Sequence, residues 1–206
     1  PRSATCVNGG IPGPLLQWRE GDGVTLRVAN RLPVPSSIHW HGVLVPVDMD
    51  GVPGLSFGGI AAGSTFVYRF RVMQSGTYWY HSHTHFQEQT GLYGPIVISP
   101  RAGERHPSAR DYVVMLSDWT DENPDHVFAT LKRDSDYYHW HRRSVGDFIA
   151  EAHRRGLRAT RGEGAMWRRR RMNQADIADV SGLTYTYLMN GHTPAANWTA
   201  LFDCGE

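Results

Sequence analysis

Short runs of alternating apolar and polar residues dominate the first hundred positions, and they constrain the fold more than any other feature of the chain. In residues 65–72, Phe66, Tyr68 and Phe70 fall on one face at a spacing of two residues. This period is typical of a half-buried antiparallel strand. Residues 24–28 alternate in the same way. The pattern predicts sheets with one face in a core.

Turn-forming residues separate these runs at short intervals. Gly-Asp-Gly at 21–23 and Asp-Gly-Val-Pro-Gly at 50–54 are sequences that favour tight turns. Further β-rich runs occupy 38–45, 77–83 and 93–98. Strands of this length and spacing predict an all-β fold, either a sandwich or a barrel.

The second half of the chain predicts a different organisation. A length of 206 residues exceeds that of one ordinary domain. The polar, basic and proline-flanked segment 101–110 predicts a linker. We therefore expect a first domain over 1–100 and the start of a second domain over 111–206, with a helical insertion at about 125–180.

Local signals predict helices inside the insertion. Ser144 and Asp147 are spaced as in a capping box, which predicts a helix that runs to about His153. Gly156 then fits the position that ends such a helix. A second short helix is predicted at 173–180. Strands are expected on either side of the insertion, at 112–116 and 184–189.

The charge balance argues against one class of function. The chain has 21 Lys and Arg against 20 Asp and Glu, for a net charge of +1, so no global attraction to nucleic acid is expected. Ten arginines lie within 142–171, four of them in the run 168–171. No recognised motif of stacking aromatics accompanies them, and we interpret the stretch as a solvated face. No apolar run is long enough to span a membrane.

Two His-x-His pairs carry the candidate chemistry, His39-Trp40-His41 and His81-Ser82-His83. On a strand, residues i and i+2 point to the same face about 6.6–7 Å apart, so each pair presents two imidazoles side by side. Two such strands next to each other would bring four imidazoles together. Neutral imidazole is a ligand for Cu, Zn, Fe and Ni, with the highest affinity for Cu(II).

Other interpretations of these histidines remain open. A single pair fits surface or packing histidines equally well, and only the occurrence of two pairs beside aromatics favours a metal site. Four imidazoles could also hold a structural zinc ion. A third pair, His139 and His141, lies in a basic region where a surface or packing role is favoured. His85 continues the alternation of the second pair, and we interpret it as a turn or surface residue.

Longer motifs surround the two pairs. Ile-His-Trp-His-Gly at 38–42 and Trp-Tyr-His-Ser-His at 79–83 resemble the two N-terminal copper motifs of the multicopper oxidases. The remaining motifs resemble the bacterial copper-resistance, laccase-like branch of that family, and the resemblance covers essentially the whole chain. These further segments are 7–14, 48–54, 86–95, 117–122 and 185–198.

The resemblance implies a fold and a set of copper ligands. Members of the family consist of cupredoxin domains, which are Greek-key β-barrels, and a type 2/type 3 trinuclear copper cluster reduces O2 to water. By position, His39 corresponds to a type 2 ligand, and His41, His81 and His83 correspond to type 3 ligands. Asp50 corresponds to an acidic proton relay, although a turn residue before a glycine is the alternative.

The resemblance also has gaps. The C-terminal copper motifs of the family are absent from this chain, and neither Cys6 nor Cys204 lies between histidines. We therefore expect an N-terminal fragment, inactive in isolation, with type 1 copper only in a missing C-terminal cupredoxin domain. The parent enzyme is expected to be periplasmic after export, to oxidise Cu(I) or phenol-like donors, and to serve copper resistance. The alternative is a non-catalytic module that sequesters copper.

Overall fold

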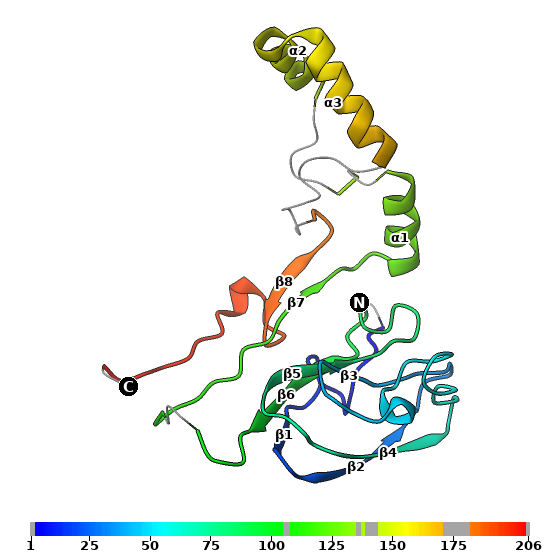
Figure 1. Cartoon of the computed structure of the whole chain (residues 1–206), viewed down its shortest axis with the longest axis vertical. Coiled ribbons are helices and arrows are strands. Elements are labelled where there is room, and N and C mark those ends of the chain that lie inside the picture. Colours follow the sequence, from blue (N-terminus) through cyan, green and yellow to red (C-terminus); the bar gives the residue numbers. More distant parts are fainter. Residues whose placement is uncertain (1–2, 105–107, 135–136, 139–143, 171–181, 205–206) are drawn as a thin grey trace. The chain divides into compact units, whose positions relative to one another are not determined.

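The structure is a computed structural model that describes residues 3–104, 108–134, 137–138, 144–170 and 182–204 (Figure 1). The chain forms two compact units. The first contains almost all of the strands, and the second contains the helices.

A four-stranded sheet forms one layer of the first unit, which comprises Pro1–Trp119 and Tyr187–Glu206. Its strand order is β1-β6-β5-β3, where β1 runs parallel to β6 and the other neighbours are antiparallel. A chain that returns next to a non-consecutive strand is typical of Greek-key folds. The four strands are β1 (Leu16–Arg19), β3 (His39–His41), β5 (Gly76–His81) and β6 (Tyr93–Ser99).

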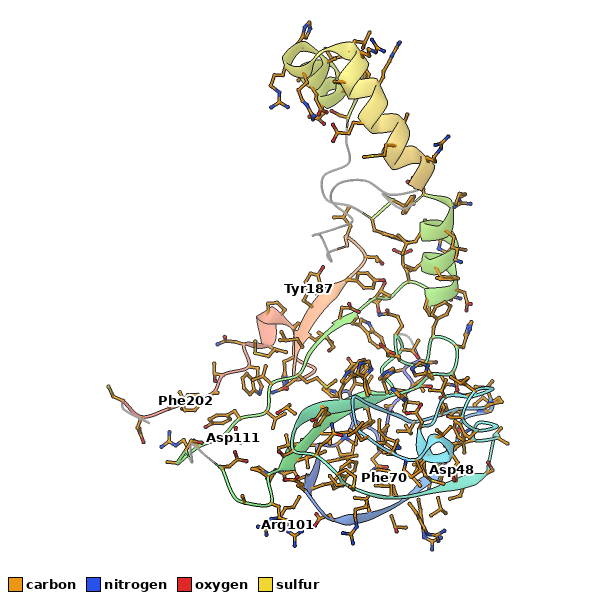
Figure 2. The ribbon with its side chains drawn as sticks, in the orientation of Figure 1. Asp48, Phe70, Arg101, Asp111, Tyr187 and Phe202 are labelled. Atoms are coloured by element: carbon orange, nitrogen blue, oxygen red, sulfur yellow. The ribbon has the colours of Figure 1, made fainter. Side chains whose placement is uncertain are left out.

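A second layer consists of the antiparallel strands β2 (Gly23–Ala29) and β4 (Thr65–Arg71). Both strands were predicted from their two-residue period, because the alternating side chains reach the core from one face only. The two layers share one core, in which the Trp40 ring of β3 lies 5.0 Å from the Tyr68 ring of β4. Phe70 lies inside the same core (Figure 2).

The prediction of an all-β fold is therefore confirmed for the first unit, which is a β-sandwich. Among the residues described, the strands do not close into a barrel. A 3₁₀ turn, η1 (Val47–Met49), lies in the connection after β3, and another, η3 (Pro194–Ala196), follows the last strand.

Several strand boundaries differ from the predictions for identifiable reasons. The run 38–45 forms a strand only over β3, because Gly42 adopts a positive φ of 79° and the Val43 amide turns back to the Trp40 carbonyl. The run 77–83 ends as a strand at His81. The strand β1 was not predicted, since its four residues are too few for a clear period.

The strand predicted at 112–116 is displaced along the chain. The strand in this region is β7 (Leu116–Trp119), which pairs with β8 (Thr186–Met189). Before β7, the amide side chain of Asn190 donates to the Val113 carbonyl and accepts from the Met115 amide. The Asn190 side chain thus forms the hydrogen bonds to these backbone groups that a partner strand was expected to form.

Among the residues that the structure describes, the second unit, Thr120–Thr186, contains the helices α1 (Pro124–Arg133), α2 (Val145–Arg155) and α3 (Leu157–Arg170). The predicted capping box is present at the start of α2, and Gly156 ends that helix. The helix α3 was not predicted, because Gly162 and Gly164 lower its intrinsic propensity. The helix predicted at 173–180 lies outside the described residues.

No helix in the described part of the chain is both long enough and apolar enough to cross a bilayer.

Tyr68 provides a test of the core. Its ring is fully buried, and its hydroxyl accepts a hydrogen bond from the Ile38 amide. Burial raises the pKa of Tyr68 from 10.0 to about 12. The unfolded chain therefore loses the phenolic proton at a lower pH than the folded chain. As a result, the contribution of protonated Tyr68 to the free energy of unfolding is complete below pH 10 and is lost as the pH rises towards 12.

We expect Tyr68→Phe to lower the free energy of unfolding by about 1 kcal/mol at pH 7, through the lost hydrogen bond. Above pH 10 we also expect the stability of the variant to fall less steeply with pH than that of the unmodified chain. The two slopes should differ by up to about 1.4 kcal/mol per pH unit. Urea unfolding monitored by fluorescence at several pH values measures both effects. Tyr187→Phe, at a side chain that is 46% exposed, is the control. An unchanged alkaline slope in Tyr68→Phe would contradict this account.

Candidate metal centre

The pairing of β3 with β5 brings the two His-x-His motifs together. The strands are antiparallel, and His39 lies opposite His81 while Trp40 lies opposite Tyr80. Both Trp40 and Tyr80 are only 2% exposed and belong to the core. Because neighbouring side chains alternate between the faces of a sheet, His39, His41 and His81 all lie on the other face.

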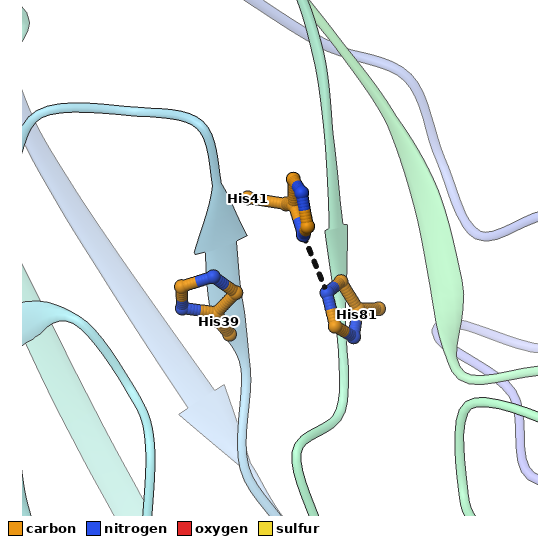
Figure 3. Close-up of side chains that lie close together, drawn as sticks. All are labelled: His39, His41 and His81. Atoms are coloured by element: carbon orange, nitrogen blue, oxygen red, sulfur yellow. Dashed lines mark hydrogen bonds between the residues drawn. The ribbon is translucent and has the colours of Figure 1, made fainter. Parts of the chain in front are cut away.

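Three of the predicted imidazoles converge on one point (Figure 3). One ring nitrogen from each of His39, His41 and His81 lies within 4.8 Å of the other two. Nδ1 of His41 and Nε2 of His81 lie 3.1 Å apart. The sheet register thus produces a compact group of nitrogen donors.

His83 lies beside this group but not within it. Its ring centroid is 4.8 Å from that of His39 and 5.1 Å from that of His81. Because β5 ends at His81, sheet pairing does not position His83. Its backbone amide donates to the hydroxyl of Ser37 at 2.9 Å, which supplies the missing restraint.

Asp50 contacts the first imidazole through two oxygens. Nδ1 of His39 lies 2.8 Å from the Asp50 carbonyl oxygen and 3.3 Å from a carboxylate oxygen. Both oxygens are acceptors, and the carbonyl accepts the hydrogen bond from Nδ1, so Nδ1 carries the proton and Nε2 keeps its lone pair. The turn that brings Asp50 this close requires Gly51, where an ideal Cβ would lie 1.8 Å from the Ile38 carbonyl oxygen.

Two further residues at this site were not predicted. Nδ1 of His81 lies 2.6 Å from a carboxylate oxygen of Glu88. The ring of Trp79 stacks on that of His81 at 4.1 Å and lies 5.0 Å from that of His41. Glu88 lies in the motif at 86–95 and Trp79 begins the motif at 79–83, but only the folded loop and strand show their contacts.

Burial favours the neutral form of two of the imidazoles. The pKa of His41 and that of His83 are both lowered, first by desolvation and then by the neighbouring histidines. The nearby carboxylate of Glu88 opposes this shift in both residues. Neutral imidazole is the form that binds a metal.

The donor set fits a metal that prefers nitrogen ligands. Two imidazole nitrogens bound to one tetrahedral ion at about 2.0 Å lie about 3.3 Å apart. The observed spacing of 3.1 Å between His41 and His81 is close to that value. The residues present are thus compatible with a copper-type or zinc-type ion, and the geometry alone does not choose between these metals.

The remaining candidate residues lie away from the three converging imidazoles or outside the described residues. His85 is exposed, at a positive φ of 50°, and its ring packs on Phe86 at 4.5 Å. His139, His141 and Arg171 lie outside the described residues, as does the side chain of Arg168. The free Cys6 and Cys204 are both exposed.

Comparison with known proteins identifies relatives of the whole chain. A family model described as "Multicopper oxidase" matches residues 1–103. The Copper resistance protein A homolog of Pseudomonas syringae pv. tomato is 59% identical over 205 residues, which cover 100% of this chain and 35% of that protein. Copper resistance protein A of Escherichia coli is 56% identical, with 100% and 34% coverage. The chain therefore spans about a third of the length of these curated relatives.

Solved structures show the same fold. A structure titled "Crystal structure of multicopper oxidase" superposes with a TM-score of 0.53 at 37% identity, covering 57% of this chain and 42% of that one. The L499M mutant of the laccase from B. aclada gives a TM-score of 0.51 at 39% identity, with 61% and 24% coverage. These similarities confirm the predicted cupredoxin-like class, and copper is the cofactor that the similar proteins imply.

A pair of glycine variants tests the turn that carries Asp50. Gly51 and Gly54 have nearly equal positive φ values, 82° and 78°, but a Cβ has no neighbour within 4 Å at Gly54. Replacement of either by Ala costs about 1–2 kcal/mol for the backbone conformation. We expect Gly51→Ala to lower the free energy of unfolding by about 1–3 kcal/mol more than Gly54→Ala, because of its clash. Equal losses in urea unfolding would show that the close approach is unimportant.

Proposed function

Because this chain belongs to the multicopper oxidase family, we propose that it supplies part of the copper centre of an enzyme that reduces O2 to water. The convergence of three imidazole nitrogens within 4.8 Å on one face of the sheet carries the proposal. The similarity of residues 1–103 to the family model covers the same strands. Neither observation depends on the other.

The proposal assigns a role to each histidine. His39 would hold type 2 copper, and His41, His81 and His83 would hold type 3 copper. The remaining ligands and the type 1 copper would come from a C-terminal cupredoxin domain of the same polypeptide. This part of the proposal is supported by the length of the curated relatives, of which the chain covers 34–35%.

Copper supplies one-electron redox chemistry and a binding site for O2. The residues of this chain orient the imidazole rings and favour their neutral, metal-binding form. The carbonyl of Asp50 holds the proton of His39 on Nδ1, which directs the Nε2 lone pair away from the turn. The Asp50 carboxylate is 33% exposed, so its Oδ1 can take a proton from solvent and release it near His39. Asp50 is thus proposed as a proton relay.

The electron donors of the complete enzyme are proposed to be Cu(I) or phenol-like compounds, and its role is proposed to be copper resistance in the periplasm. Support comes from relatives named for copper resistance and from a relative named as a laccase, Laccase-1 of Cryptococcus neoformans, which is 40% identical over 144 residues. Oxidation of such donors would deliver electrons singly, as copper accepts them.

Copper titration of the 206-residue chain tests the ligand assignment. We expect the double variant His39→Ala/His81→Ala to bind less copper per chain than the unmodified chain, because it loses two of the three converging donors. The control is His126→Ala/His153→Ala, which removes two exposed histidines of the second unit. Copper content after gel filtration, measured by atomic emission, reports the result. Equal copper content in the two double variants would reject the assignment.

A chimaera tests the oxidase function. In it, residues 1–206 replace the matching third of the Pseudomonas syringae relative. We expect copper-dependent O2 consumption with a phenolic donor, measured with an oxygen electrode. Asp50→Asn should lower the rate about 10–100-fold at unchanged copper content, because proton transfer of this kind contributes at least that much. Glu20→Ala removes a carboxylate that accepts from the Arg101 amide and contacts none of the proposed ligand histidines, and it is the control. A chimaera that binds copper without consuming O2 would favour the sequestering module.

A further inference from the structure

The second His-x-His pair has a carboxylate partner of its own. Nδ1 of His81 lies 2.6 Å from Oε2 of Glu88 and 3.1 Å from the carbonyl oxygen of Ser82. The His81 side chain is 6% exposed, whereas that of Glu88 is 45% exposed. The contact therefore joins a buried ring to a carboxylate that still reaches solvent.

We propose that Glu88 is a positioning residue for the metal centre. Through its carboxylate it would hold the proton of His81 on Nδ1 and direct the Nε2 lone pair towards His41. The inference rests on the proposed function, because it gives His81 the role of a metal ligand.

The chemistry of the contact fixes the tautomer. A carboxylate and a carbonyl oxygen are both acceptors, so the His81 nitrogen that faces them must be the N–H. Nε2 is then the donor atom, and it lies 3.1 Å from Nδ1 of His41. A carboxylate behind a ligating imidazole also makes the ring a stronger donor.

The loop that carries Glu88 is anchored by its neighbour. Gln87 is buried, and its side chain donates to the Pro35 carbonyl at 2.7 Å. Its amide oxygen accepts hydrogen bonds from the hydroxyls of Ser36 and Ser82. Because these contacts fix the backbone next to Glu88, the carboxylate is held at a defined place relative to His81.

Each His-x-His pair thus has one imidazole with an acidic residue behind it. Asp50 reaches His39 chiefly through its backbone carbonyl, with its carboxylate oxygen farther away at 3.3 Å. Glu88 reaches His81 through the carboxylate itself. The two rings are therefore oriented by different groups, and only the second contact depends on an acidic side chain.

The experiment compares copper affinities in the 206-residue chain, measured by competition with a chelator. We expect Glu88→Ala to weaken copper binding about 10–100-fold, the usual effect of losing such a partner. Glu88→Gln keeps an acceptor oxygen and should recover a large part of the affinity. Neither replacement overpacks its surroundings, because neither side chain is larger than that of Glu88, which is 45% exposed. The Cu(II) electron paramagnetic resonance spectrum should change in the Ala variant and return towards the original in the Gln variant.

Two controls separate the possible failures. Gln89→Ala alters the same loop but removes a side chain bonded to Asp118, so it should leave copper affinity unchanged. His81→Ala tests the ligand itself. If His81→Ala weakens copper binding but Glu88→Ala does not, the Ser82 carbonyl suffices and the inference about Glu88 is wrong. If His81→Ala has no effect, the proposed function itself fails.

Discussion

The antiparallel register of β3 and β5 is the constraint on which the candidate centre depends. It pairs Trp40 with Tyr80 on the core face, and the same register places His39 opposite His81 on the other. A slip of one residue would move Trp40 out of the core and the imidazoles into it. The burial of two aromatic side chains therefore specifies the position of the histidines.

Loop residues next to the strands also help to position the imidazoles. Sheet pairing ends at His81, and the next residues are held by buried hydroxyl and amide groups. The hydroxyl of Ser37 accepts from the His83 amide and contacts the hydroxyls of Ser82 and Thr84. Unpaired polar groups are costly in such a place, so the network has few alternative arrangements. These contacts restrain the residues next to the imidazoles.

Much of the fold was predictable because its signals are local. The alternation in β2 and β4 and the capping box of α2 each involve residues close in sequence. The missed features lack such signals. The strand β1 is four residues long, and its hydrogen-bonding partner, β6, lies about eighty positions away in the chain. A short strand of this kind is recognised by its pairing and not by its own pattern.

The sequence alone determined the residue types of the centre, the two His-x-His spacings and the all-β class, because spacing along a strand decides which side chains share a face. The tertiary structure decided which of these imidazoles meet and which groups orient them. It placed His39, His41 and His81 in one group, left His83 beside it, and brought Glu88 onto Nδ1 of His81. The physical reason is that pairing register and loop anchoring arise from contacts between distant segments, which no local pattern contains.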